Sequence, residues 1–272
     1  MSHFAPFLLA GKSAFVAGGT SGINFAIAEA FVRNGARVAV LSRKQEKVEA
    51  AVAHLARFGT ASGYAADVRE YAAVEAALKA FHAVAGPIDI VVSGAAGNFV
   101  APATGISSNG FRTVLEIDLL GTFHVLRASF DLLRKPGASL ISISAPQSTA
   151  VSFGQAHVSA AKAGIDMLTR CLAVEWGAEG VRVNAIVPGP IEDTEGMARL
   201  APTLAVRRAF ERAVPLGRFG TKQDVANLAL FMASTASQYM TGTVTYCDGG
   251  QVLTMGGAMS PSAMQELLSQ GA

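Results

Sequence analysis

The stretch VAGGTSGIN, residues 16–24, decides the fold of this 272-residue chain. It joins a short apolar run to a run with helical periodicity, and its glycines let the backbone pass close to a ligand. A dinucleotide pyrophosphate suits such a turn, because the positive end of the following helix meets its charge. Asn24 stands where the usual pattern has its last glycine, but asparagine tolerates unusual backbone angles, so we expect the turn to persist. The predicted cofactor contacts of this turn are Gly18, Thr20, Ser21, Gly22, Ile23 and Asn24.

Outward from this turn, short β-branched runs alternate with longer helical patterns. The predicted strands are 14–18, 37–41, 61–66, 88–93, 139–144, 181–187 and 244–246. The predicted helices are 23–34, 44–58, 70–85, 109–133 and 155–178. This alternation predicts an α/β fold, a single Rossmann-type doubly wound parallel sheet of about seven strands flanked by helices, with residues 1–272 forming one domain. The segment 192–214 departs from the alternation after a predicted strand, and we expect it to form a lid over a substrate cleft.

The composition argues against several classes of protein. Hydrophobic residues make up 51% of the chain, which is ample for a sheet covered on both faces. The formal net charge is +2 and the basic residues are scattered, so we expect no nucleic-acid partner. No run approaches the roughly 20 apolar residues of a membrane span, and residues 1–10 lack the basic region of a signal peptide. We therefore expect no membrane partner and a cytoplasmic location. Cys171 and Cys247 lie in apolar sequence, and we expect reduced core thiols with no disulfide or metal.

The end of the second predicted strand indicates which dinucleotide binds. It carries no acidic residue, and two bases follow it instead. A carboxylate there would bind the ribose hydroxyls of NAD and repel a 2′-phosphate, whereas adjacent bases attract that phosphate. We therefore predict NADP(H), contacted by Ser42, Arg43 and Lys44.

Later motifs extend the pattern from about residue 11 to residue 250 and resemble those of the short-chain dehydrogenase/reductase family. These motifs are Asp67-Val68, the turn at 93–97, Lys162 on a helix, the loop at 188–191 and Asp248-Gly249-Gly250. The resemblance implies that Asp67 and Val68 hold adenine and that Lys162 bonds the nicotinamide ribose. It also implies that the two remaining segments contact the cofactor through Ala95, Ala96, Gly97, Pro188, Gly189 and Ile191.

The family's usual acid is missing. Most members place a tyrosine four residues before the lysine, where this chain has Val158, and a catalytic serine falls at or beside Ser144-Ala145. Carbonyl reduction needs a proton donor beside the developing oxyanion, and valine has no proton to give. Counting back from Val158 favours Ala145 for the serine position, although Ser144 could still donate to an oxyanion.

Within the family, the chain resembles the 2,4-dienoyl-CoA reductases of peroxisomal type, which also lack the tyrosine. The resemblance is carried by the segments 95–99, 117–123, 173–177 and 188–196. It implies that Asp118 and Lys162 are catalytic, acting with a bound water, and that the substrate is an acyl-CoA of fatty-acid β-oxidation. It also implies a homotetramer or homodimer that pairs through helices 109–133 and 155–178. The implied substrate contacts are Arg43, Arg69, Phe99, Ser107 and Arg199. The C-terminal sequence 267–272 does not match a peroxisomal targeting signal.

The chemistry of a conjugated thioester explains how the tyrosine can be absent. Hydride adds to the δ-carbon, charge moves to the thioester oxygen as a dienolate, and the α-carbon takes a proton later. A water can supply that proton, and Asp118, costly in its apolar helical context unless it is paired, is the candidate to orient it. His157 is the rival donor, although its helical phase favours a structural histidine with satisfied hydrogen bonds. We expect Phe123 and Trp176 to be core residues.

Other functions are compatible with the same residues. The chain could be a catalytically silent NADP-binding subunit or sensor, or a 3-oxoacyl or carbonyl reductase with an atypical acid. The acyl chain length, the product double bond, delivery by CoA or by an acyl-carrier protein, and dimer versus tetramer all stay open.

Overall fold

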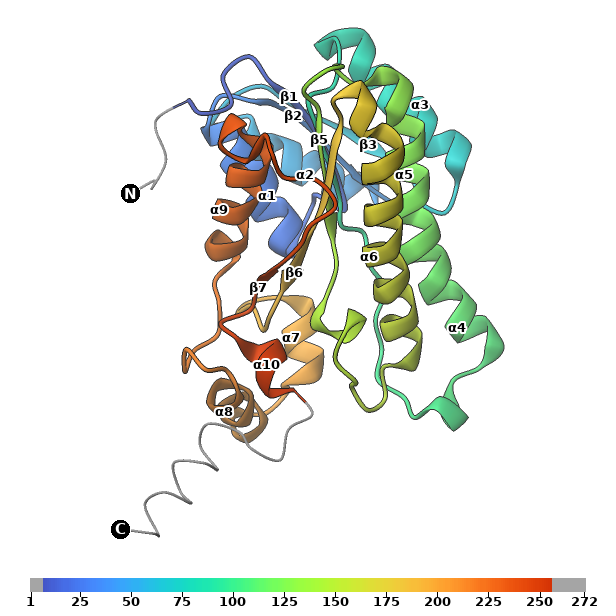
Figure 1. The fold of residues 1–272 in the computed structure, drawn as a ribbon, viewed down its shortest axis with the longest axis vertical. Coiled ribbons are helices and arrows are strands. Elements are labelled where there is room, and N and C mark those ends of the chain that lie inside the picture. The colour runs from blue at the N-terminus through green and yellow to red at the C-terminus, as the bar shows by residue number, and fades with distance from the viewer. Residues whose placement is uncertain (1–6, 256–272) are drawn as a thin grey trace.

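The protein is a seven-stranded parallel sheet covered by helices on both faces, in a computed structural model that describes residues 7–255 (Figure 1). The strand order is β3-β2-β1-β4-β5-β6-β7, so the chain reverses direction across the sheet between β1 and β4. Ligands of open α/β sheets bind at such a switch point, outside the carboxyl ends of the strands. The strands are β1 (Ser13–Ala17), β2 (Arg37–Ser42), β3 (Ala61–Ala65), β4 (Ile90–Ser93), β5 (Ser139–Ile143), β6 (Arg182–Pro188) and β7 (Val244–Cys247). The predicted fold class is confirmed.

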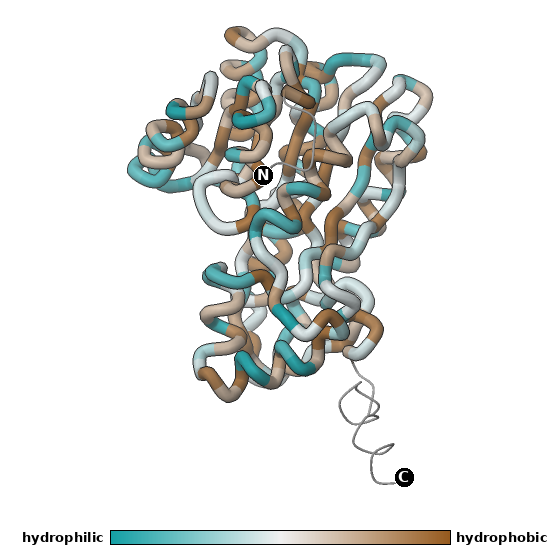
Figure 2. Tube along the Cα trace, turned by 90° about the vertical axis from the view of Figure 1, so that its left-hand side faces the viewer, coloured by the Kyte–Doolittle hydropathy of each residue, from teal (hydrophilic) through white to brown (hydrophobic). Residues whose placement is uncertain are grey.

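Two hydrophobic cores lie on opposite faces of the sheet. One fills the space beneath α1 and α9, and the other lies beneath α3, α5 and α6. The strands β1, β4 and β5 are buried along their whole length, because helices cover both faces of the sheet. Figure 2 shows hydrophobic and hydrophilic segments alternating along the chain. The helices are α1 (Gly22–Arg33), α2 (Gln45–Leu55), α3 (Tyr71–Ala85), α4 (Ser108–Leu115), α5 (Gly121–Ser129), α6 (Ala156–Trp176), α7 (Glu195–Leu200), α8 (Leu204–Ala213), α9 (Lys222–Ala233) and α10 (Gln251–Thr254).

The predicted helix 109–133 is not one regular helix. A π-helical turn, Glu116–Leu120, separates α4 from α5, and the segment ends in a 3₁₀ turn, Phe130–Leu132. A π turn inserts one extra residue into the helical repeat and is often found at functional sites. Sequence periodicity alone did not reveal this break, because the residues on both sides are apolar.

The predicted lid at 192–214 consists of two short helices, α7 and α8. They lie beyond the carboxyl ends of the strands, at the bottom of the view in Figure 1. Threonine begins each helix: the Thr194 hydroxyl accepts from Met197 N, and the Thr203 hydroxyl accepts from Val206 N. A threonine cap fixes where a helix starts, so these two residues set the position of the lid.

Two predictions about the core are wrong. Cys171 is exposed on α6, and Phe123 on α5 is 39% exposed, whereas Trp176 is buried as predicted. Both helices carry apolar residues on more than one side, so the sequence pattern could not tell an inner position from an outer one.

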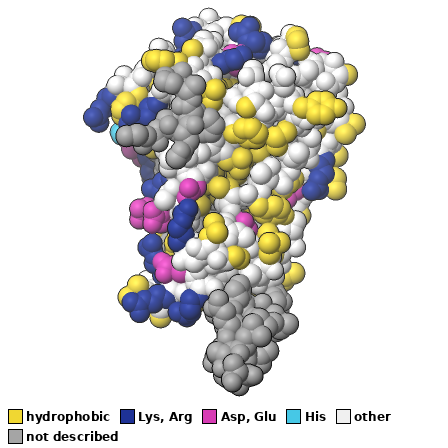
Figure 3. All heavy atoms as spheres, turned by 60° about the vertical axis from the view of Figure 1, so that its left-hand side comes forward, with side chains coloured by type: hydrophobic (Ala, Val, Ile, Leu, Met, Phe, Trp, Pro, Cys, Tyr) yellow, Lys and Arg dark blue, Asp and Glu magenta, His cyan; other side chains and the backbone are white. Residues whose placement is uncertain are grey.

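On the face drawn in Figure 3, basic and acidic side chains lie beside one another at the left-hand edge. Within residues 7–255, no helix is both long enough and apolar enough to cross a membrane. The segments 1–6 and 267–272, which bear on targeting, lie outside the described residues.

Candidate active site

A cleft of about 1040 Å³ opens at the carboxyl ends of the strands. It is lined by the turn before α1, the ends of β2 to β6, the π turn, the start of α6 and the lid. Every cofactor residue predicted from the sequence lines this cleft except Lys44. The sheet therefore gathers residues that are spread from Gly18 to Ile191 in the sequence.

The first turn has the geometry that a pyrophosphate requires. Gly18 has φ +76°, and a Cβ atom there would stand 2.8 Å from the backbone nitrogen of Ala95. Only glycine fits this position, which brings the backbone of the turn to the wall of the cleft. Ser21 precedes α1 without a side-chain hydrogen bond to the helix end, so the first amides of α1 are not capped by it. These features fit an anionic diphosphate.

The basic residues after β2 divide into two groups. Arg43 lines the cleft, and Lys47 from the first turn of α2 lines it as well. Lys44 precedes α2 and pairs with Glu46 at 3.8 Å, with both side chains exposed. Lys47 was missed from the sequence because the direction of a side chain at a helix start depends on the local turn. The structure therefore places two basic side chains, Arg43 and Lys47, in the cleft wall after β2.

Asp67 lies in the cleft wall and is held by a neighbour. The Arg69 guanidinium donates to its carboxylate at 2.7 Å, and this hydrogen bond holds the pKa of Asp67 below its ordinary value. Arg69, predicted as a substrate contact, is therefore engaged by Asp67 and does not line the cleft.

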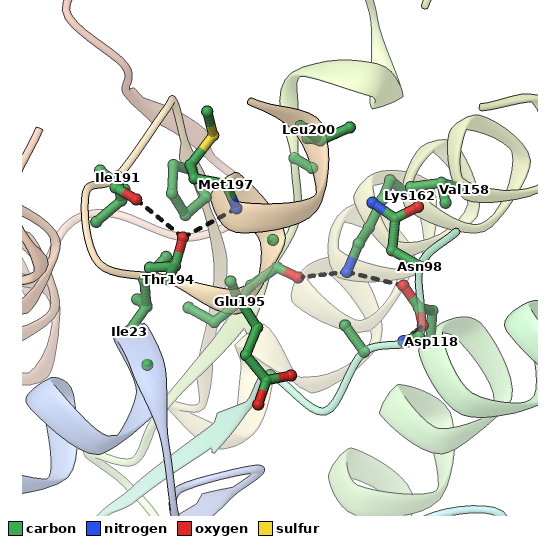
Figure 4. Close-up of a pocket in the computed structure, with 18 of the residues that line it drawn as sticks. Ile23, Asn98, Asp118, Val158, Lys162, Ile191, Thr194, Glu195, Met197 and Leu200 are labelled. Carbon is green, nitrogen blue, oxygen red and sulfur yellow. Dashed lines mark hydrogen bonds and ion pairs between the residues drawn. The ribbon is translucent and has the colours of Figure 1, made fainter. Parts of the chain in front are cut away.

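An ion pair lies at the inner end of the cleft. Lys162 Nζ is 3.1 Å from Asp118 Oδ2 and donates to the backbone oxygen of Ile143 at 3.1 Å (Figure 4). The Gly97 amide donates to Asp118 Oδ1 at 2.7 Å. Asp118 is 0% exposed and Lys162 is 5% exposed. A buried charge of either sign would be costly alone, so the two opposite charges compensate each other at this position.

The π turn explains how Asp118 reaches this position. It lies in the middle of Glu116–Leu120, between the end of α4 and the start of α5. Lys162 comes from α6 and Ile143 from the end of β5, so three elements meet at the pair. The structure thus brings together the two residues that the sequence assigned to catalysis.

Several uncharged residues surround the ion pair. Val158 lines the cleft beside Lys162, and Ser144 and Ala145 follow β5 in the same wall. The Ser144 hydroxyl is buried without a hydrogen-bond partner in the described structure, as are Asn98 Oδ1 and Gln155 Oε1. Unpaired buried polar atoms beside a cleft are groups that a ligand or water can satisfy. Neither Asn98 nor Gln155 was predicted as a site residue, although Asn98 lies in the segment 95–99 that carries the family resemblance.

His157 is a buried residue outside the cleft wall. It is 0% exposed, its ring lies 4.1 Å from the Phe99 ring, and neither ring nitrogen has a hydrogen-bond partner in the described structure. The expectation of a satisfied histidine is therefore wrong. Burial lowers the pKa of His157, so the imidazole is largely neutral at pH 7. A neutral ring away from the cleft is poorly placed to act as the acid.

The other predicted substrate contacts lie at the rim or farther away. Phe99 packs on His157, and the Ser107 hydroxyl caps α4 by accepting from Gly110 N at 3.0 Å. Arg199 on α7 donates to the backbone oxygen of Asn98 at 3.0 Å, which links the lid to the loop after β4. None of the three lines the cleft.

The lid contributes an apolar wall that the sequence did not identify residue by residue. Met197 and Leu200 of α7 line the cleft opposite the ion pair (Figure 4). Phe210 of α8 continues this wall, as does Phe153 from the loop after β5. The cleft is therefore polar and glycine-rich on its β1 side and apolar beneath the lid. Thr194, which was also missed, lies at the junction, and its hydroxyl donates to Ile191 O at 2.9 Å.

Comparisons with known proteins agree with this geometry. A family model described as enoyl-(acyl carrier protein) reductase matches residues 17–251. The peroxisomal 2,4-dienoyl-CoA reductase of Danio rerio, (3E)-enoyl-CoA-producing, is 43% identical over 261 residues, which cover 92% of this chain and 85% of the relative. A Bacillus subtilis protein named "Probable 2,4-dienoyl-CoA reductase", (2E)-enoyl-CoA-producing, is 37% identical over 250 residues, with 89% and 97% covered.

A solved structure extends the likeness to the fold. Gluconate 5-dehydrogenase from Burkholderia cenocepacia, in complex with NADP and tartrate, superposes with a TM-score of 0.86 at 29% identity, covering 91% of this chain and 97% of that one. Since a family model spans β1 to the start of α10 and a relative is 43% identical over most of the chain, this protein belongs to the short-chain dehydrogenase/reductase family, in the group that contains the 2,4-dienoyl-CoA reductases.

Proposed function

We propose that this protein reduces 2,4-dienoyl-CoA to 3-enoyl-CoA with NADPH, as an oxidoreductase acting on CH–CH groups in fatty-acid β-oxidation. The observation that carries the proposal is the buried pair of Asp118 and Lys162 beside Val158. A pocket that keeps the lysine, lacks the phenol and buries a carboxylate is suited to protonating carbon through water. The names of the relatives support the same substrate class.

NADPH fits the β1 side of the cleft. The amides at the start of α1 face the pyrophosphate position, and Arg43 and Lys47 supply positive charge for a 2′-phosphate. Lys162 would hold the nicotinamide ribose, and the loop at Pro188–Ile191 would receive the carboxamide. When bound, the reduced nicotinamide supplies a hydride to the δ-carbon of the diene.

The protein's own side chains then stabilise the negative charge of the dienolate and direct the protonation of its α-carbon. The Ser144 hydroxyl, buried and unpaired, donates to the thioester oxygen as the dienolate forms. Asp118 orients a water that protonates the α-carbon, and the proximity of Lys162 favours proton loss from that water. The product is a 3-enoyl thioester. Protonation at the γ-carbon would give the 2-enoyl isomer instead.

The apolar wall beneath the lid fits the acyl chain. Met197, Leu200 and Phe210 enclose it, and Arg199 at the rim is placed to meet a phosphate of CoA as the lid closes.

The experiment compares three substrates with the purified protein. NADPH absorbance is followed with a 2,4-dienoyl-CoA, a 3-oxoacyl-CoA of equal length, and the same dienoyl group on an acyl-carrier protein. We expect rapid oxidation with the dienoyl-CoA and slow oxidation with the 3-oxoacyl-CoA. In D₂O, one solvent deuterium should enter the α-carbon of a 3-enoyl product, as read by mass spectrometry and NMR. Faster turnover of the 3-oxoacyl-CoA would identify a carbonyl reductase, and NADPH binding without turnover of any thioester would identify a silent subunit.

Assembly and location are further parts of the proposal. Leu120 at the end of the π turn, Phe123 on α5, and Met167 and Val174 on α6 are exposed apolar side chains, which supports a homodimer or homotetramer paired through these helices. A monomeric mass in light scattering at micromolar concentration would refute it. A cytoplasmic location rests on the sequence arguments alone and is tested by imaging a tagged full-length chain.

A further inference from the structure

The side chain of Asn24 joins the two turns that form the floor of the cofactor half of the cleft. Asn24 lies in the first turn of α1, is 9% exposed, and donates from Nδ2 to the backbone oxygen of Gly94 at 2.7 Å. Gly94 follows β4 directly and begins the turn that carries Ala95, Ala96 and Gly97. The amide therefore bridges the pyrophosphate turn and the turn after β4.

Asn24 also fills the space in which a side chain at position 94 would lie. A Cβ atom built on Gly94 would meet three atoms of the Asn24 amide, Oδ1, Nδ2 and Cγ, the last at 2.6 Å. These are the three nearest atoms to it. Gly94 is not among the glycines with positive φ, so its backbone conformation does not itself require glycine. At Gly18, in contrast, the positive φ and the Ala95 backbone both exclude other residues.

The turn after β4 leads directly to the catalytic carboxylate. Gly97, three residues after Gly94, donates its amide to Asp118 Oδ1 at 2.7 Å. A shift of Gly94 therefore moves both the cofactor floor at Ala95 and the amide that holds Asp118.

We propose that Asn24 and Gly94 form a matched pair in which Asn24 is a positioning residue: its amide sets the spacing between the pyrophosphate turn and the turn after β4, and position 94 is glycine because position 24 is asparagine. The inference rests on the proposal that the cleft binds NADPH, and not on the identity of the substrate.

A double-mutant cycle tests the pair, with NADPH affinity measured by fluorescence titration. Gly94→Ala puts a methyl group against the Asn24 amide and should weaken NADPH binding by on the order of tenfold. Asn24→Gly removes the hydrogen bond and should weaken binding less. The double variant gives the methyl group the vacated space and should bind NADPH to within about threefold of wild type.

Two matched controls separate the pair from general effects. Ala26→Gly adds a glycine to the same helix, and Gly177→Ala adds a methyl group where nothing lies within 4 Å. Both should bind NADPH as the wild type does. Unfolding midpoints are measured for all variants, and kcat is measured with the dienoyl-CoA. If Gly94→Ala fails to fold, folding and NADPH binding by the double variant still report the rescue.

The outcomes separate this inference from the proposed function. If the wild type binds no NADPH, the proposed function fails. Three results would overturn the matched pair while leaving that function intact: additive losses in the double variant, wild-type affinity in Gly94→Ala, or a lower unfolding midpoint with unchanged NADPH affinity.

Discussion

Replacing Asp118 by asparagine tests the chemistry of the ion pair with almost no change in shape. The carboxylate meets two groups: Oδ1 accepts a hydrogen bond from Gly97 N at 2.7 Å, and Oδ2 forms an ion pair with Lys162 Nζ at 3.1 Å. An asparagine amide has a single oxygen. Whichever way it turns, either Gly97 N–H or Lys162 Nζ will face an NH₂ group. Lys162 also loses the negative charge that compensates its own in a site where both groups are buried.

The magnitude follows from this burial. Removing one partner of a buried ion pair costs about 3–5 kcal/mol, because the remaining charge is left uncompensated. For a chain of this size each kcal/mol lowers the unfolding midpoint by roughly 2–4 °C, so a fall of about 6 °C or more is expected. In the reaction, loss of the water-orienting carboxylate should lower kcat by on the order of 100-fold or more. NADPH affinity should stay near wild type, because the proposed role of Asp118 is in proton transfer, whereas Lys162 is the residue of the pair that contacts the cofactor.

The assays are thermal unfolding, NADPH titration and steady-state reduction of a dienoyl-CoA. Asp131→Asn is the matched control, since Asp131 pairs with Arg127 at 3.4 Å on the surface, where an ion pair contributes little. The reasoning would be refuted if Asp118→Asn unfolded at the wild-type temperature and kept most of its activity.

Three other variants probe the cofactor, the histidine and the missing tyrosine. Arg43→Asp should reverse the preference from NADPH to NADH, because it replaces a base in the cleft wall by an acid, and titration with both cofactors measures this. Burial lowers the pKa of His157 from 6.5, so the unfolded chain binds a proton there at a higher pH than the folded chain does. Above pH 6.5 the neutral His157 ring therefore does not lower the free energy of unfolding. As the pH falls below 6.5, protonation of the unfolded chain lowers the free energy of unfolding. His157→Gln should flatten the pH dependence of the unfolding free energy as the pH falls below 6.5, above the window in which Glu29, Asp67 and Asp224 protonate. The same variant should keep most of its activity, and an indispensable His157 would move the proton source to the imidazole. Val158→Tyr should not create efficient 3-oxoacyl-CoA reduction, because Ala145 stands at the position predicted for the partner serine, and a comparison of kcat/KM for the two thioesters checks this.

The sequence predicted the fold because the signals that define it are local. Strand ends agreed to within one or two residues, since five of the seven runs, β1, β2, β4, β5 and β6, stop at a glycine, serine or proline whose backbone preference is local. Asp118 and Lys162 were found together because their motifs resemble those of a family in which both are catalytic. The sequence around each residue did not predict that the two side chains would form an ion pair.

What the sequence did not predict depends on side-chain direction. Lys44 and Lys47 are both bases near the end of β2, but only Lys47 faces the cleft. Phe123 was expected inside because α5 is apolar on several sides, and periodicity does not distinguish a core from a surface that a second copy could cover. The burial of His157 against the Phe99 ring could not be predicted, because Phe99 lies far away in sequence.

The π turn at Glu116–Leu120 makes this stretch sensitive to its length. Each residue of a regular helix advances about 100° around the axis, and a π turn absorbs one surplus residue. Deleting one residue here would restore regular α-helix and leave α4 and α5 nearly in phase, but it would remove the widened turn that carries Asp118 and shift its carboxylate around the axis, away from Lys162. Substitution of the half-exposed Leu120 would leave the register intact. In a mutational library, this turn should accept changes of residue at positions other than Asp118 and reject single-residue deletions, a sensitivity to chain length that substitution scanning does not measure.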